Sequence, residues 1–350
     1  MQKVYTHIGV GIDVSKSDFK VCMMGNLGGK QQKVISSTKF DNTLSGFKKF
    51  WAWVDKHLKK CVCDQVEYLL EATGVYHENL AWYLYEQEAC VIVVLPNRAK
   101  AFFKSEGLHS KTDKIDAQGL AKMVLQKELK PWQPMSSKLK DLRSLTRYHE
   151  TLQKEITQNK SRLEALKHSH EPNKFVFNEL KKLLRHLENQ KRRVNDEIIR
   201  VAQEDEAFYQ KVENLTSIHG IGLLSALVII AETNGFELFT SQKQLVSYAG
   251  YDVQYNDSGA HKGKTQISKR GNTHIRRILY MPALCAINKE GVFADLYQRV
   301  FERTKIKMKG YTAVQRKLLV MIYTLWKKNE EFDYNHQNNK IVEEQDALLH

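Results

Sequence analysis

The chain has 350 residues, 42% of them hydrophobic and 27% charged, which is the composition of a globular protein long enough for two domains or three small ones. Its 54 lysines and arginines outnumber 40 acidic residues, giving a net charge of +14, and this favours a polyanionic partner, nucleic acid more than an anionic membrane surface. No apolar run approaches the roughly 20 residues of a membrane-spanning helix, and the N-terminus lacks the layout of a secretory signal. Five scattered cysteines predict reduced thiols in a cytoplasmic protein.

The first 125 residues alternate strand and helix signals. Residues 6–25 alternate apolar and polar side chains, and residues 31–40 follow as a second strand, a pattern typical of a hairpin. Helical spacing over 42–58 is followed by a short buried strand in 66–74, a helix at 77–88 and a continuous apolar strand at 89–96. This order predicts an α/β domain over residues 1–130, built on a mixed sheet.

The next segment has a helical character. No glycine occurs between Gly119 and Gly220, and a second long helix runs from about Phe175 past Ile199. We predict a long helical, coiled-coil-like arm over 131–212, either an antiparallel hairpin or a dimerising arm, with an ordinary helix bundle almost equally favoured. A mainly helical C-terminal domain over 213–330 and a polar tail over 331–350 complete the chain. The heptad-like stripe of the first arm helix consists of Leu142, Leu145, Leu152, Ile156, Leu163 and Leu166.

Four carboxylates in the first domain form an unusual set. Asp13 interrupts the apolar strand "GIDV", where a carboxylate is unfavourable unless it is paired or binds a metal. Glu71 ends the strand "EYLLE", at the end of the strand where α/β sheets present ligand-binding residues. Asp113 and Asp116 are three residues apart at a helix start and share one face. Each acid alone is more readily explained as a cap, a first-turn acid or an ion-pair partner.

Taken together, the four acids favour a magnesium site. Carboxylates from three separate elements would meet at the mouth of one sheet and hold two Mg²⁺ ions roughly 4 Å apart, the arrangement used for in-line phosphoryl chemistry. Mn²⁺ would be able to substitute. Lys111 and Lys114 would then lie beside the scissile phosphate.

Several stretches carry a family resemblance. "GIDVSKSDF", "EATGVYH" and "KTDKIDAQGLA", followed by "IHGIG", "LVSYAGYDVQYNDSG" and "ISKRGNTHIRRILY", resemble an insertion-sequence transposase family whose RuvC-like domain is named for four acids, Asp-Glu-Asp-Asp. The family includes Piv-type DNA invertases and recombinases guided by a bridge RNA. The resemblance covers about residues 5–125 and 210–300. It implies an RNase H/RuvC-like first domain and a bacterial, nucleoid-associated DNA recombinase that works through a covalent serine–DNA intermediate.

The resemblance also assigns roles to residues. The four acids become metal ligands, and Ser258 in "YNDSG" becomes the nucleophile. A serine hydroxyl is a weak nucleophile and needs a base or a metal; because His261 is the only evident base nearby, we expect a composite site in which metals of the first domain activate Ser258. Ser268 is the alternative nucleophile, although its position favours a role as a helix cap or phosphate ligand. The positive charge and hydrogen-bond donors around Ser258 that would hold a phosphodiester are His261, Lys262, Lys264, Lys269 and Arg270.

Two further stretches are ambiguous. "IHGIG", with His219, Gly220 and Gly222, resembles the turn of a helix-hairpin-helix, whose backbone amides bind nucleic-acid phosphate, and an ordinary tight turn between helices fits it equally well. The basic run Lys191–Arg193 is by default a solvated helix face, with nucleic-acid backbone contact as the sharper alternative.

Three functions stay open at this point. The first is a Mg²⁺-dependent DNA recombinase acting on double-stranded DNA with a structured guide RNA, as a homodimer able to pair into a tetramer. The second is a metal-dependent junction nuclease without a covalent step, which would not need Ser258. The third is a non-enzymatic nucleic-acid scaffold, against which Asp13 in an apolar strand argues.

Overall fold

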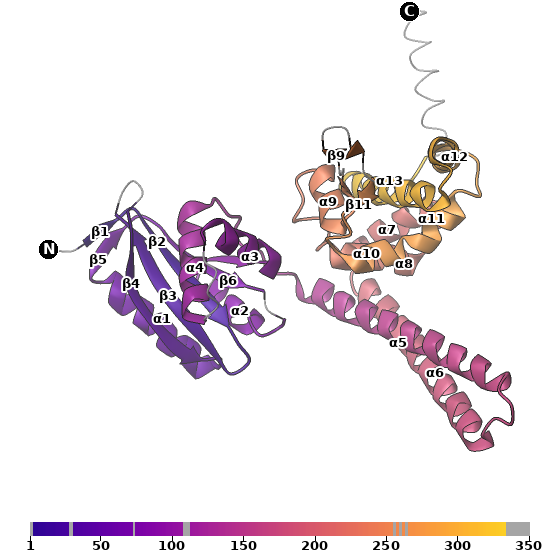
Figure 1. Ribbon diagram of the computed structural model, residues 1–350, viewed down its shortest axis with the longest axis horizontal. Helices are drawn as coiled ribbons and strands as arrows, with labels where there is room; N and C mark the ends of the chain where they lie inside the picture. The colour runs from indigo at the N-terminus through magenta and orange to yellow at the C-terminus, as the bar shows by residue number, and fades with distance from the viewer. Residues whose placement is uncertain are drawn as a thin grey trace, which may run out of the picture. The chain divides into compact units, whose positions relative to one another are not determined.

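The computed structural model describes residues 3–27, 31–72, 74–107, 113–254, 257–258, 261–262 and 265–333; for residues 3, 113, 114, 257, 258, 261 and 262 it describes the backbone alone. The chain divides into two compact units, Met1–Pro134 and Met135–His350 (Figure 1). The predicted arm over 131–212 and the predicted C-terminal domain over 213–330 thus lie almost entirely within the same unit. Most of the predicted polar tail lies outside the described residues.

A five-stranded mixed sheet forms the centre of the first unit, with strand order β4-β3-β2-β6-β7. The strands β2 (His7–Val14), β3 (Asp18–Asn26) and β4 (Gln32–Asp41) pair antiparallel. The strands β6 (Val66–Glu71) and β7 (Cys90–Val94) extend the sheet in parallel from β2. A separate parallel pair joins β1 (Lys3–Tyr5) to β5 (Cys61–Cys63). The mixed α/β sheet predicted from the sequence is confirmed.

The prediction of one strand over residues 6–25 is wrong. The segment folds into two strands, β2 and β3, around a turn in which the Ser15 N–H and the Ser15 hydroxyl both donate to Asp18 O at 2.8 Å. The apolar side chains of one face occupy even positions up to Val14 and odd positions from Phe19. The alternation therefore changes phase across the polar Ser-Lys-Ser turn, and this change is the local signal of the turn. As a result, Asp13 lies near the end of β2 and not in the middle of a longer strand.

Helices cover both faces of the sheet. On one face, α1 (Leu44–Leu58) and α2 (Glu78–Glu86) pack on the even-numbered residues of β2 through a core that includes Ile12 and Phe50. On the other face, α3 (Pro96–Ser105) and α4 (Asp113–Gln126) pack against Leu69 and Ile92. Both faces of β7 are therefore buried, which explains its continuous apolar sequence.

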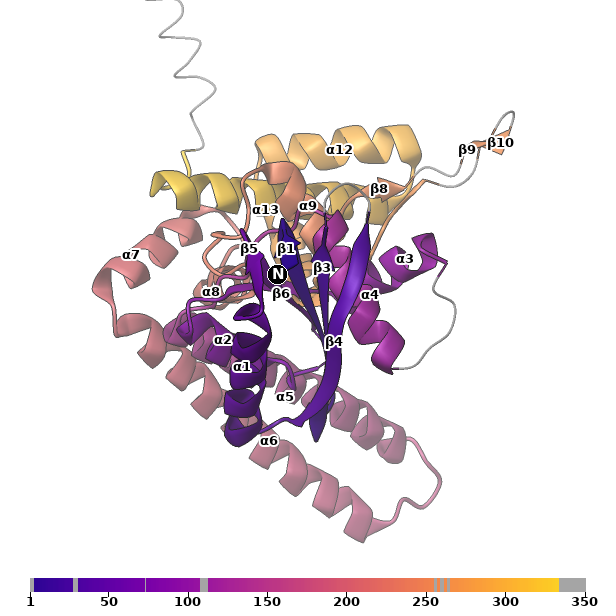
Figure 2. The ribbon, with the colours of Figure 1, turned by 90° about the vertical axis from the view of Figure 1, so that its left-hand side faces the viewer.

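The second unit begins with two long helices, α5 (Ser137–Lys167) and α6 (Lys174–Gln203). They form an antiparallel hairpin (Figure 2), held by a small core of Leu152, Ile156, Leu184 and Leu187. The Asn173 side chain caps α6 by accepting from the Phe175 and Val176 N–H groups. The two helices and the break between them occur where the sequence predicts them.

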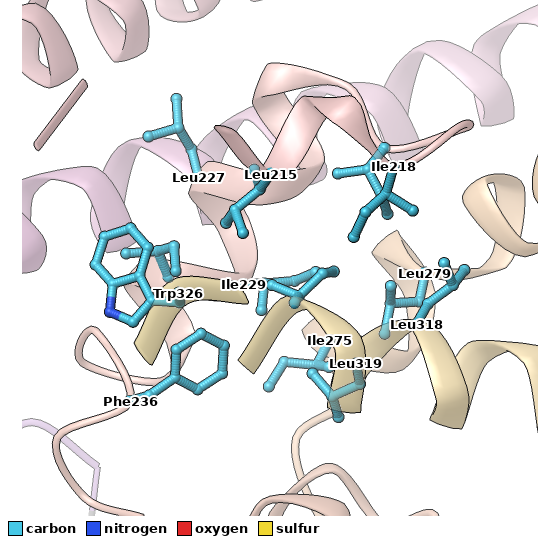
Figure 3. Close-up of a cluster of buried hydrophobic side chains, with 14 of the residues drawn as sticks. Leu215, Ile218, Leu227, Ile229, Phe236, Ile275, Leu279, Leu318, Leu319 and Trp326 are labelled. Carbon is cyan, nitrogen blue, oxygen red and sulfur yellow. The ribbon is translucent and has the colours of Figure 1, made fainter. Parts of the chain in front are cut away.

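Shorter helices complete the second unit. They are α7 (Glu206–Asn214), the 3₁₀ turn η1 (Leu215–Ser217), α8 (Leu223–Glu232), α9 (Gln242–Ala249), α10 (Thr273–Ile278), α11 (Tyr280–Ala286), α12 (Val292–Thr304) and α13 (Lys307–Lys328). Helix α8 is buried from Ala226 to Glu232, as expected of a helix that is apolar on all sides except for Ser225 and Glu232. Figure 3 shows Ile229 of α8 amid Phe236, Ile275 and Leu319. In the described part of the chain, no helix combines the length and apolarity needed to cross a membrane.

Candidate active site

Asp13 and Glu71 occupy neighbouring positions on adjacent parallel strands. In the register of β2 and β6, Ile12 lies opposite Leu70, so Asp13 and Glu71 are the next residues at the same end of the sheet. Because side chains alternate along a strand, both carboxylates leave the sheet on the face that carries Gly11. Both residues are half-buried.

Helix α4 lies directly on that face. A Cβ atom on Gly9 would be 2.7 Å from Ala121 O, and one on Gly11 would be 2.1 Å from Ala117 O. The helix therefore runs antiparallel to β2 and touches its backbone. Two strand residues and four helix residues each advance about 6 Å, so the next step along β2 brings Asp13 under the first turn of α4.

That first turn carries the other two predicted acids. Asp113 is the first residue of α4, and the half-buried Asp116 follows it. The side chain of Asp113 lies outside the description, and among the described side chains no group of three or more His, Cys, Asp or Glu residues is arranged to hold a metal. The four-acid site thus stays a prediction. The structure brings the three elements that carry these acids to one edge of the sheet.

Two residues at this edge were not singled out from the sequence. Lys20 lies directly opposite Asp13 in the pairing of β2 and β3. The Asn42 side-chain amide donates to Ser15 O at 2.9 Å and to Tyr76 O at 3.1 Å, which ties the end of β2 to the loop after β6. The two Asn42 bonds span 27 and 34 residues of the chain, so no local pattern signals them, and the pairing of Lys20 with Asp13 depends on the turn between β2 and β3.

His77 also lies in the loop after β6. Burial lowers the pKa of its imidazole, in spite of the nearby Glu78 carboxylate, so the ring is neutral at pH 7. Its Nδ1 is buried and has no hydrogen-bond partner among the residues that the structure describes. Sequence reasoning did not single out this histidine, because nothing in "GVYH" indicates burial.

The segment that carries Ser258 is built from short strands. β8 (Val253–Gln254) pairs with β11 (Gln266–Ile267), and β9 (Asp257–Ser258) pairs with β10 (His261–Lys262). The register sets Ser258 opposite His261. We call β9 and β10 the serine hairpin. Figure 2 shows it standing clear of the helices of its unit. The sequence predicted an open loop here; the two-residue strands were too short for periodicity to reveal.

The segments on either side of the serine hairpin, residues 248–254 and 266–272, are held together by close backbone contacts. We call these two segments the frame. The Ser268 N–H donates to Asp252 O at 2.7 Å, and the Lys269 N–H donates to Gly250 O at 3.1 Å. Gly250 has φ +76°, the left-handed conformation that glycine adopts without strain at a helix end. A Cβ atom on Gly271 would lie 2.4 Å from Tyr248 O, so this position needs glycine. Much of "SKRGN" therefore has a structural role.

The expectation that Ser268 caps a helix is wrong. Helix α10 begins at Thr273, and its cap is Asn272, whose Oδ1 accepts from the His274 and Ile275 N–H groups. The Ser268 hydroxyl instead accepts from the Arg270 N–H at 3.4 Å. Serine and asparagine are both favoured caps, and the sequence offered both within five residues.

Asn272 also contacts a buried carboxylate that sequence reasoning missed. Its Nδ2 donates to Glu232 at 2.7 Å, and the Tyr248 hydroxyl donates to Glu232 O at 3.0 Å. Arg143 and Arg147 of α5 pair with the same carboxylate. Glu232 thus joins the arm helix to the frame below the serine hairpin.

The "IHGIG" stretch forms a tight turn between η1 and α8. Gly220 has φ +92° and would bring a Cβ atom within 2.7 Å of Pro282 O. Gly222 precedes the first residue of α8 with open space around it, and His219 is exposed. A helix–turn–helix shape is present, and phosphate binding by His219, Gly220 and Gly222 stays a prediction.

The predicted basic residues are only partly described. Lys269 and Arg270 are exposed. Lys111 and Lys264 lie outside the described residues, and only the backbone of Lys114 and Lys262 is described. Their contact with a phosphodiester therefore stays a prediction.

Comparison with known families assigns both halves of the chain. Residues 10–172 match the IS110 DEDD model, described as a transposase. Residues 212–298 match the model described as the transposase IS116/IS110/IS902 family. Together the two matches span most of the chain, and they include Asp13, Glu71 and Ser258.

Curated relatives agree with this assignment. The pilin gene-inverting proteins of Moraxella bovis and Moraxella lacunata are each 28% identical over 339 residues, which cover 95% of this chain and 98% of theirs. A probable family 20 transposase of Pseudomonas aeruginosa is 25% identical over 128 residues, 35% of this chain and 38% of its own.

Two solved structures show a weaker likeness. T. thermophilus RuvC in complex with a Holliday junction substrate has 10% sequence identity and a TM-score of 0.27, covering 36% of this chain and 99% of RuvC. Another Thermus thermophilus RuvC structure has 14% identity and a TM-score of 0.24, covering 36% of this chain and 83% of that one. The two family matches and the full-length relatives are what decide the assignment: the chain belongs to the IS116/IS110/IS902 family of transposases and is a DNA transposase.

Proposed function

We propose that this transposase breaks and joins DNA strands through a covalent bond between the Ser258 oxygen and a DNA phosphate, with Asp13, Glu71, Asp113 and Asp116 holding divalent metal ions. The observation that carries the proposal is the neighbouring position of Asp13 and Glu71 on adjacent strands, under the first turn of α4. Half-buried carboxylates converging on one sheet edge are unfavourable without a cation between them.

The donor set fits a hard metal ion. Carboxylate oxygens are the ligands that Mg²⁺ prefers, and Mn²⁺ accepts the same set. When bound, such ions supply Lewis-acid stabilisation of charge on a phosphoryl oxygen. Asp13 and Glu71 are positioned by strand pairing, and Asp113 and Asp116 by the packing of α4 on Gly9 and Gly11.

The serine step conserves the energy of the phosphodiester. The Ser258 oxygen forms a bond to phosphorus and loses its proton, while the bond from phosphorus to one deoxyribose oxygen breaks and that oxygen takes up a proton. Attack by a hydroxyl of another strand reverses the step and frees the serine. His261, opposite Ser258 in the hairpin register, is the candidate base for the serine proton.

A second nucleic acid and a second protomer belong to the same proposal. The net charge of +14 suits binding of a structured guide RNA as well as double-stranded DNA. Strand exchange joins two duplexes, so at least two protomers must act together as a dimer or a tetramer. The exposed Phe175, Val176 and Leu183 of α6 support assembly through the arm.

Covalent trapping tests the proposal. Cells would carry the protein together with its native flanking DNA, and wild type would be compared with Asp13→Ala, Ser258→Ala and Ser268→Ala. After digestion of the DNA, any phosphoserine would be mapped by mass spectrometry. We expect a nucleotide adduct on Ser258 in wild type and in Ser268→Ala, and none in Asp13→Ala or Ser258→Ala.

Other outcomes would correct specific parts. Cleavage that persists in Ser258→Ala without any adduct would replace the covalent mechanism by the junction-nuclease alternative. An adduct on Ser268 would identify Ser268, in the frame, as the nucleophile in place of Ser258. Unchanged cleavage in Asp13→Ala would show that the acids at this edge of the sheet are not needed for strand cleavage.

A further inference from the structure

A polar groove lies in the second unit, between the two arm helices and the start of α8. Its volume is about 460 Å³, and its walls come from α5, α6 and Leu224 in the first turn of α8. Sequence analysis singled out two stretches separately, the basic run Lys191–Arg193 and the turn "IHGIG" before α8. In the structure, Lys191 and Arg192 of the first stretch line this groove together with Leu224, which lies two residues after the second stretch; we call it the hairpin groove.

Positive charge dominates the hairpin groove. Lys160, Lys191 and Arg192 line it together with one carboxylate, Glu188. Lys160 pairs with Glu188 at 2.8 Å. The hydrogen-bond partners of the other two cations are neutral amides: Lys191 donates to Gln153 at 2.6 Å and Arg192 to Asn189 at 3.2 Å. These bonds hold the cations in place without neutralising their charge.

Leu224, in the first turn of α8, forms part of the same wall. The first N–H groups of a helix have no acceptor within it and carry the positive end of the helix dipole. Apart from Gly222 itself and its chain neighbours, no atom of the described residues lies within 4 Å of where a Cβ on Gly222 would be, so the backbone just before α8 leaves room for a bulky anion. His149, half-buried in the groove, is neutral at pH 7 because burial and Lys191 lower its pKa.

We propose that the hairpin groove seats the phosphodiester backbone of a nucleic acid, with Lys191 and Arg192 as its principal phosphate contacts. The inference rests on the proposed function only in that the enzyme acts on nucleic acid. Two fixed cations in a groove beside a helix start recognise phosphate and carry no base readout. DNA and structured RNA present this same chemistry, and the experiment distinguishes them.

Binding measurements on the full-length protein test the inference. The probes are a labelled DNA duplex and a labelled RNA duplex, each of about 30 base pairs, titrated without divalent metal at salt from about 0.05 to 0.2 M. The variant is Lys191→Gln with Arg192→Gln. The matched control is Lys182→Gln with Arg193→Gln, which removes the same charge from exposed residues of the same helix that do not line the groove.

We expect the groove variant to bind at least one probe about tenfold more weakly at 0.1 M salt, with a salt slope smaller by about two, one unit for each lost contact. The control should stay close to wild type. The probe that responds identifies the nucleic acid in the groove. Equal weakening by both variants, or wild-type slopes in the groove variant with both probes, would overturn the inference. A thermal unfolding midpoint equal to wild type shows that the variant is folded.

The binding experiment tests the hairpin groove independently of the serine mechanism. Binding is measured without metal, so it requires no cleavage. A groove variant that loses affinity while Ser258→Ala still cleaves DNA would leave the groove as a nucleic-acid site of a transposase with different chemistry. A groove variant with full affinity would show that the hairpin groove does not bind nucleic acid, and it would not affect the evidence for the serine mechanism.

Discussion

Arg147 donates two hydrogen bonds to Glu232, from Nε to Oε1 at 2.6 Å and from Nη2 to Oε2 at 2.9 Å. The Glu232 side chain is fully buried, so its charge depends on these partners. Because Asn272 also donates to Glu232, the pair connects α5 to the frame below the serine hairpin.

Arg147→Ala should destabilise the second unit by about 3 kcal/mol, because it leaves a buried carboxylate short of its main partner. Hydrogen exchange followed by mass spectrometry should show faster exchange in α8 and α10. The matched control is Arg200→Ala, since Arg200 makes the same two-bond contact with Glu197 in an exposed place, where ion pairs contribute less than about 1 kcal/mol. An equal loss of stability in Arg147→Ala and Arg200→Ala would contradict the expectation that burial makes the Arg147–Glu232 pair the stronger of the two.

The same pair makes stability depend on pH. Burial opposes ionisation of Glu232, yet the hydrogen bonds from Arg147 and Asn272 and the charges of Arg143 and Arg147 together lower the pKa below its ordinary value of 4.5. A carboxylate with a depressed pKa stabilises the fold above that ordinary value, and the contribution is lost as the pH falls through the native pKa. We expect Glu232→Gln to flatten the acid limb of stability against pH, measured by urea unfolding. An unchanged limb would show that other carboxylates control it.

Gly11→Ala should displace α4 from the sheet. The new Cβ would lie 2.1 Å from Ala117 O, which is backbone and cannot turn aside, and overpacking of this kind costs about 1–3 kcal/mol or more. Since α4 carries Asp113 and Asp116, DNA cleavage should fall with the thermal midpoint. Gln118→Ala is the control, because Gln118 is an exposed residue of the same helix and a surface substitution of this kind changes stability by at most about 0.5 kcal/mol. Full activity in Gly11→Ala would separate α4 from the chemistry.

Lys191→Gln should raise the pKa of His149. Burial is the main cause of the lowered pKa and the charge of Lys191 the second, so removing that charge should move the pKa upward while leaving it below its ordinary value. Nuclear magnetic resonance titration of the histidine ring would follow it, with His149→Gln to identify the signal. Arg193→Gln, an exposed residue of the same helix, should leave the pKa unchanged. No shift in Lys191→Gln would mean that the two groups do not interact across the hairpin groove.

Metal binding should depend on Asp13. Titration calorimetry with Mn²⁺ should detect binding to wild type, and a concentration about 100 times the dissociation constant should stabilise the protein by about 2.7 kcal/mol. Asp13→Ala should lose both effects. Asp55→Ala removes an exposed carboxylate of α1 that pairs with Lys59 and should retain them. Wild-type binding in Asp13→Ala would place the metal ligands elsewhere.

Local sequence patterns predicted most helices and strands of the first unit and the two long helices of the second. The helices α1, α2, α5 and α6 and the buried strand β7 follow from apolar periodicity, and "IHGIG" indicated a tight turn. Periodicity could not reveal strands of two residues, as in the serine hairpin. At Ser15–Ser17 the alternation changes phase, and the prediction of one strand overlooked that signal. The helix cap was misassigned because Ser268 and Asn272 compete within one short segment.

The sequence by itself determined which residues are chemically unusual: a carboxylate in an apolar strand, paired acids at a helix start, a serine among basic residues. Only the tertiary structure decided which of them meet. The neighbouring positions of Asp13 and Glu71 depend on strand order, the pairing of Arg147 with Glu232 on the packing of α5 against α8, and the hairpin groove on an antiparallel helix pair. Such contacts join residues far apart in the chain, and their free energy comes from burial, which a local pattern does not contain.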